Sequence, residues 1–90
     1  MNNVQKTVKK RHYTRDELVS LADKRGYLLN FSYSLKVFEL RNKKHPDNWG
    51  WIIRPSNGVK VGLVRECEMQ EWDDILNYNI KRLESIYNNV

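Results

Sequence analysis

With 90 residues, 40% of them hydrophobic and 30% charged, the chain is long enough for one domain with a modest core and too short for a large enclosed active site as well. Its apolar runs extend over only a few residues, which excludes a transmembrane helix, and the N-terminal residues lack the apolar core of a signal peptide. We therefore expect a cytoplasmic protein that does not enter membranes.

Charge is distributed unevenly along the chain. The net charge is +5, but residues 1–65 hold fourteen Lys and Arg against five Asp and Glu, whereas residues 66–90 hold two against six. Clustered cations are the electrostatic footprint of a nucleic-acid-binding protein, so the basic first part favours a polyanionic partner. The acidic last part would then face away from the polyanion or towards a basic partner.

The residues that carry chemistry do not form a catalytic or metal-binding motif. Cys67 is the single cysteine, and His12 and His45 lie far apart in the sequence, so neither an internal disulfide nor a zinc site is expected. Glycine-rich phosphate loops and nucleophile motifs are absent, and the adjacent Asp73 and Asp74 would point to different faces of a helix. We therefore expect a protein that is not an enzyme and needs no cofactor or metal.

Residues 1–13 are interpreted as a flexible basic arm that precedes a single domain over residues 14–90. The arm holds four cations and no acid. Such an arm either makes the terminus more soluble or lies along phosphates beside a DNA-binding domain. The second alternative makes Lys9, Lys10 and Arg11 candidate contacts.

The first predicted element is a helix over residues 15–25. Thr14 and Glu17 have the spacing of a capping box, in which each side chain accepts a hydrogen bond from the backbone amide of the other residue. An apolar stripe follows, and Gly26 comes just past the last turn, where a glycine commonly ends a helix.

Residues 27–65 predict an antiparallel meander of three or four short strands. The segments 35–41, 49–54 and 59–65 are rich in β-branched and aromatic residues and are separated by turn residues. Residues 27–34 alternate in polarity, which is typical of a further short strand or an extended link.

The turn after Arg54 decides which side chains of the last two strands share a face. A three-residue loop ending at Gly58 places Arg54 opposite Lys60 and keeps both out of the apolar face. The covered face would then carry Trp49, Trp51, Ile53, Val59, Val61 and Leu63, and the open face would carry Gly50, Ile52, Arg54, Lys60, Gly62 and Val64.

From about Cys67 the apolar pattern becomes helical and continues almost to the end of the sequence, with acids in the first turns. A helix of roughly twenty residues is about 30 Å long, which exceeds the width of a three-stranded sheet. The apolar stripe either covers the sheet alone or, with Asn79 at an inner position of a heptad-like seam, also pairs two copies of the chain.

The sequence therefore predicts an α+β fold: an N-terminal helix, a three- or four-stranded antiparallel meander and a long C-terminal helix packed on one sheet face. Its function is predicted to be nucleic-acid binding, to DNA in preference to RNA, in a regulatory or mobile-element (phage or plasmid) protein, because a small sheet can enter a major groove. The predicted contacts are Lys9, Lys10, Arg11, Arg41, Lys43, Lys44, Arg54 and Lys60.

Two other functions use different features of the chain. A protein-binding adaptor or inhibitor would dock its acidic C-terminal helix on a basic partner or on a second copy of the chain. A small RNA-cleaving toxin is the third hypothesis, and the lack of paired histidines or carboxylates argues against it.

Overall fold

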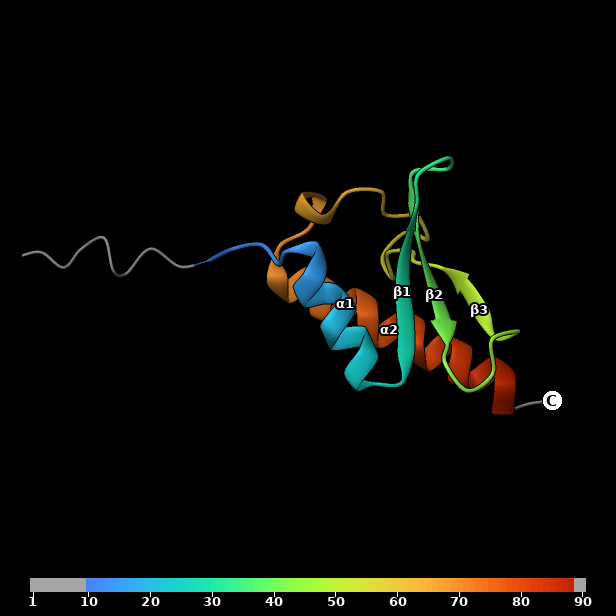
Figure 1. Cartoon of the computed structure of the whole chain (residues 1–90). Helices are drawn as coiled ribbons and strands as arrows, with labels where there is room; N and C mark the ends of the chain where they lie inside the picture. Colours follow the sequence, from blue (N-terminus) through green and yellow to red (C-terminus); the bar gives the residue numbers. More distant parts are fainter. Residues whose placement is uncertain (1–9, 89–90) are drawn as a thin grey trace, which may run out of the picture.

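The structure, a computed structural model, describes residues 10–88, with the backbone alone for residues 87 and 88. Its elements in chain order are α1 (Arg15–Lys24), β1 (Tyr27–Ser32), β2 (Val37–Asn42), β3 (Trp49–Trp51), the short 3-10 helix η2 (Val64–Glu66) and α2 (Met69–Asn88) (Figure 1). The three strands form one antiparallel sheet in the order β1, β2, β3. The predicted α+β class and order of elements are therefore confirmed.

Helix α1 begins and ends where its sequence predicts. Glu17 donates its backbone N–H to Thr14 Oγ1 over 3.2 Å, and the Thr14 N–H donates to Glu17 Oε1 over 2.9 Å, which completes the capping box. Gly26 follows the helix with a φ of +86°, in the left-handed region. Leu18 and Ala22, both fully buried, fix this helix against β1.

Strands β1 and β2 form a hairpin with a four-residue loop over residues 33–36. Ser32 pairs with Val37, and the Lys36 N–H donates to the Ser32 carbonyl over 2.7 Å. Lys36 closes the loop with a φ of +58°, a conformation common at the end of such turns. The predicted strand at residues 27–34 is thus present, while Leu35 lies in the loop rather than in the second strand.

The predicted strand over residues 59–65 is wrong. Past β3 the pairing continues only as an isolated bridge between Ile53 and Lys60, and the chain then turns into η2. The predicted register paired Arg54 with Lys60, so the observed register is displaced by one residue. Because neighbouring side chains in an extended segment point to opposite faces, this displacement reverses the predicted faces of residues 49–54, whereas Lys60 is exposed and Val61 is buried, as predicted.

Residues 52 and 61 both form backbone hydrogen bonds with β2, on the edge that does not pair with β1. Residues 59–65 therefore do not form a long hairpin with β3. Phe38 accepts a hydrogen bond from the Ile52 N–H over 2.8 Å and donates its own N–H to the Val61 carbonyl over 3.2 Å. Gly62 then passes so close to the hairpin loop that an added Cβ would lie 2.4 Å from the Lys36 carbonyl oxygen. The edge position that β3 leaves is therefore filled by residues 61 and 62.

Replacing Gly62 by alanine is expected to lower the free energy of unfolding by about 1–2 kcal/mol, because the new methyl group meets a backbone carbonyl that cannot rotate away. Gly50→Ala is the matched control: like Gly62 it has no positive φ, and a Cβ there would lie at an ordinary contact distance of 3.5 Å from the Arg82 and Leu83 side chains. Urea unfolding followed by far-ultraviolet circular dichroism measures both variants. Equal losses would contradict the close approach at Gly62.

One core lies between the sheet and both helices. Its fully or nearly buried apolar residues are Leu18, Ala22, Tyr27, Leu29, Phe38, Leu40, Ile52, Val61, Cys67, Trp72, Ile75, Leu76, Ile80 and Leu83. Phe38 packs edge-to-face on Trp72 with ring centroids 5.6 Å apart. The end of α2 extends past β3, where Ile86 is 57% exposed (Figure 1).

Asn79 ties α2 to the chain that follows β3. It is 1% exposed, its Nδ2 donates to the Ile53 carbonyl over 2.9 Å, and its Oδ1 accepts from the Ile53 N–H over 3.3 Å. The same oxygen accepts from Arg82 Nη2 over 3.0 Å. Asn79, which the predicted heptad-like seam placed at an inner position, therefore makes these hydrogen bonds within a single chain.

Candidate nucleic-acid interface

The face of the sheet turned away from the helices is formed by alternate residues of the three strands, and we call it the open face. Strand pairing places on it Leu28, Asn30 and Ser32 of β1, Val37, Glu39 and Arg41 of β2, and Trp49 and Trp51 of β3. None of these side chains is buried, whereas Tyr27, Leu29, Phe38 and Leu40 on the opposite face are 3% exposed or less.

The tryptophans of β3 lie on the open face, so their predicted place under the long helix is wrong. Trp49 is 41% exposed and Trp51 is half-buried. The covered side of β3 is formed by Gly50, where an added Cβ would lie 3.5 Å from both Arg82 Nη2 and Leu83 Cδ2. Helix α2 fits closely against this glycine, and the two indoles project to the other side.

The two indoles form a perpendicular pair with a cation over one face of each ring. Their centroids are 5.1 Å apart and their planes meet at 84°. The Arg41 Cζ atom lies 5.1 Å from the Trp49 centroid, and the Lys60 Nζ atom lies 5.8 Å from the Trp51 centroid. Both distances are within the range of a cation–π interaction. We call these four residues the indole cluster.

The two cations of the indole cluster differ in how firmly they are held. Arg41 donates from Nε to Glu39 Oε2 over 2.9 Å, pairs with the same carboxylate through Nη2, and donates from Nη1 to the Pro46 carbonyl. Lys60 is exposed and contacts the ring of Trp51. Arg41 therefore supports the ring of Trp49, while the ammonium of Lys60 is available to an approaching anion.

Arg54 lies on the covered side, which corrects its predicted place beside Lys60 on the open face. Its Nη2 atom is 3.1 Å from Glu66 Oε2 and 3.5 Å from Cys67 Sγ, and its side chain is 24% exposed. Glu66 also accepts the backbone N–H groups of Gly62 and Leu63 over 3.1 and 3.0 Å. The guanidinium therefore belongs to a network that fixes the chain before α2, and the predicted pair of opposed cations does not form.

The loop between β2 and β3 places two further predicted cations at one end of the sheet. Asn42 Oδ1 accepts from the Lys44 N–H over 2.9 Å, which shapes the start of the loop. The Lys43 ammonium pairs with Asp23 of α1, and both lysine side chains are exposed. Together with Arg25, they line an open hollow of about 580 Å³ that also includes Glu84.

The predicted arm is described only from residue 10, and Lys9 lies outside the described residues. Lys10 pairs with Glu17 at the start of α1, and Arg11 pairs with Glu68 just before α2. The Arg11 carbonyl also accepts the Met69 N–H over 2.8 Å. Lys10 therefore lies at the start of α1 and Arg11 just before α2, and both belong to a surface other than the open face.

Cys67 is buried in the core, next to the Arg54 guanidinium. Burial raises the pKa of the Cys67 thiol to about 11, so the thiol stays protonated at neutral pH. Within residues 10–88, no group of three or more His, Cys, Asp or Glu side chains could hold a metal ion. Nor is any helix of this part long and apolar enough to cross a membrane.

Comparison with known proteins adds no second line of argument, because no protein-family model, curated protein or solved structure matches the chain.

The sequence contained one signal that could have placed the indole cluster. In the segment Trp49-Gly50-Trp51, the smallest residue lies between the two largest, which is typical of a strand that a neighbouring element approaches on one face. The prediction instead gave priority to keeping Arg54 out of the core. It did not consider Glu66 as the partner that makes a half-buried guanidinium acceptable there.

Proposed function

We propose that the chain binds nucleic acid through the open face of its sheet. The observation that carries this proposal is the indole cluster: two tryptophans on an uncovered face, each with a cation over one face of its ring. Indole rings stack on bases, and Lys and Arg contact phosphates, so the cluster supplies both kinds of contact. Trp49, Trp51 and Lys60 would touch the ligand, and Arg41 would support the ring of Trp49.

The charge distribution supports the same function. Residues 1–65 carry most of the cations, and the exposed Lys43 and Lys44 extend the positive charge beyond the end of the sheet. DNA and RNA both present phosphates and base faces, so we test both and take DNA first, as the sequence predicts. A non-enzymatic regulatory or mobile-element protein remains the proposed setting.

The adaptor hypothesis depends on a free acidic surface at the start of α2. Two of its acids are already engaged by the chain itself: Glu68 pairs with Arg11, and Asp73 accepts a hydrogen bond from the Tyr13 hydroxyl over 2.7 Å. That hydrogen bond raises the pKa of Tyr13 to about 12. We favour nucleic acid over a basic protein partner because the indole cluster offers stacking rings together with an exposed cation, whereas the start of α2 offers charge alone.

Lys60→Glu is expected to weaken the binding of labelled oligonucleotides and to reduce the slope of log affinity against log salt by about 1. Lys81→Glu is the matched control, because it makes the same charge change at an exposed position of α2, in the helical layer. Fluorescence anisotropy at several salt concentrations measures both variants. Absence of binding by the unmodified protein at low salt, for DNA and RNA alike, would contradict the proposed function.

A further inference from the structure

We infer that the open face takes single-stranded nucleic acid and holds one unpaired base in the corner between Trp49 and Trp51. This inference rests on the proposed function and adds to it the state of the ligand. It differs from the binding of a duplex groove, which the sequence alone predicted for the sheet.

The perpendicular arrangement of the indoles defines the corner. Because the ring planes meet at 84°, a base stacked on one indole directs its edge towards the other. Inside a duplex, both faces of each base are covered by its neighbours and only base edges reach the grooves. An unpaired base is therefore the ligand that presents a free face to these rings.

The two cations suit the two parts of a nucleotide. The Arg41 guanidinium lies over one face of the Trp49 ring and is held there by the Glu39 carboxylate and the Pro46 carbonyl, so a base would stack on the opposite face. The Lys60 ammonium is exposed, and its contact with the ring is weak enough to be exchanged for a phosphate oxygen. Stacking on one ring and a phosphate contact beside the other would hold one nucleotide without reading its sequence.

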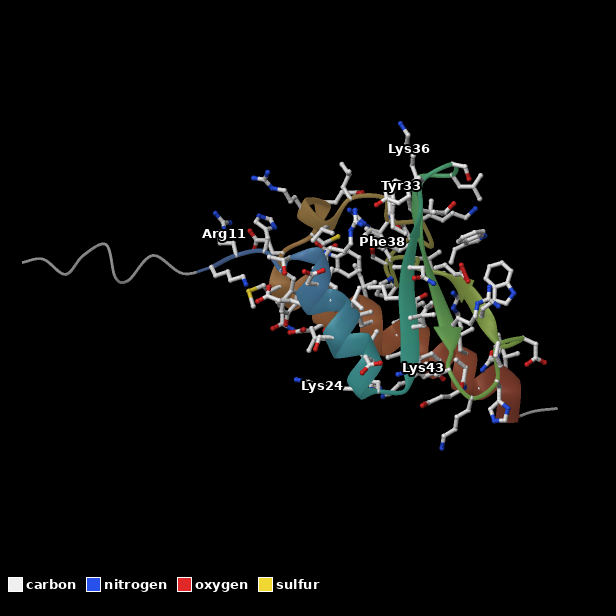
Figure 2. All side chains as sticks on the ribbon, in the orientation of Figure 1. Arg11, Lys24, Tyr33, Lys36, Phe38 and Lys43 are labelled. Atoms are coloured by element: carbon white, nitrogen blue, oxygen red, sulfur yellow. The ribbon has the colours of Figure 1, made fainter. Side chains whose placement is uncertain are left out.

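Cations are also present at both ends of β2, along which a single strand could extend. Lys36 projects from the hairpin loop before the strand, and Lys43 projects at the opposite end of the sheet (Figure 2). The pair between Lys43 and Asp23 is exposed to solvent, so a phosphate can compete for it. The two tryptophans of the indole cluster lie on β3, the strand next to β2.

The decisive experiment compares labelled probes of equal length by anisotropy: a 12-mer of thymidines, a 12-mer of uridines, a blunt duplex, and a 12-mer with abasic sites that keeps every phosphate. Both single strands are expected to bind roughly tenfold or more tightly than the duplex or the abasic strand, because stacking on aromatic side chains supplies most of the difference. The two single-stranded probes also show whether deoxyribose or ribose is preferred.

Trp49→Leu is expected to weaken single-strand binding roughly ten- to one-hundredfold, and Trp49→Tyr, which keeps a stacking ring, to retain most of it. Tyr33→Leu is the matched control, because it removes an aromatic ring that is 69% exposed in the hairpin loop, away from the cluster. The emission of Trp49 and Trp51 should be quenched by the probe, whereas the fully buried Trp72 should not respond. Circular dichroism checks that each variant is folded.

The outcomes separate this inference from the proposed function. If duplex and abasic probes bind as tightly as the single strands, or if Trp49→Leu changes nothing while Lys60→Glu weakens binding, the base-stacking inference is wrong and phosphate binding by the open face remains. If no probe binds at low salt, both are wrong.

Discussion

Replacing Asn79 by leucine is expected to lower the free energy of unfolding by about 3 kcal/mol, although leucine has a similar size and a higher helix propensity. The amide of Asn79 satisfies both the N–H and the carbonyl of Ile53, and its own side chain is 1% exposed. Leucine would leave these two backbone groups without their partner at a site from which water is largely excluded. It would also remove one of the two acceptors of Arg82 Nη2, leaving the Trp51 carbonyl as the other.

Asn77→Leu is the matched control for this prediction. It makes the same replacement two residues away on α2, at an exposed position, and its effect should stay within about 0.5 kcal/mol. Urea denaturation of both variants measures the difference. If Asn79→Leu were as stable as the unmodified chain, the hydrogen bonds between α2 and residue 53 could not be what holds this segment in place.

The helices were predictable because their signals are local. The capping box of Thr14 and Glu17 and the glycine after the helix specify α1 within a dozen residues. The apolar stripe through Trp72, Leu76 and Leu83 specifies which side of α2 is buried. None of these signals depends on residues distant in the sequence.

The sheet register was not predictable from local rules, because its determinants are distant in the sequence. Arg54 was assigned to solvent on the rule that an unpaired charge is not buried. Its partners are Glu66 and Cys67, twelve and thirteen residues later, which the structure brings to the covered side. Once Arg54 is accepted there, alternation places Trp51 on the open face.

The candidate site changed for the same reason. The sequence identified the loop lysines and Lys60 as cations without a covering element, and the structure leaves them exposed. It placed Trp49 and Trp51 on the covered face, because the register was chosen to keep Arg54 out of the apolar face. Only the register shows that the helical layer meets Gly50, which leaves the two largest side chains of β3 for the opposite face.

Arg54→Glu is expected to lower the free energy of unfolding by about 2–4 kcal/mol and to leave nucleic-acid affinity unchanged under conditions in which the variant is folded. The new carboxylate would lie beside Glu66, which now accepts from Arg54 and from the N–H groups of Gly62 and Leu63. Repulsion between the two carboxylates would loosen the chain that precedes α2. The open face, on the other side of the sheet, would keep the indole cluster.

Lys60→Glu is the matched comparison, because it reverses one charge at a residue that the sequence placed on the same face as Arg54. We expect Lys60→Glu to change stability by less than about 0.5 kcal/mol, since its side chain is exposed, and to weaken binding. Thermal unfolding and anisotropy on the same two proteins give the complete comparison. If Arg54→Glu lost as much affinity as Lys60→Glu and lost no stability, Arg54 would have to lie on the open face, which would contradict the observed register. Opposite outcomes in the two assays are what side chains on opposite faces of one thin sheet should produce.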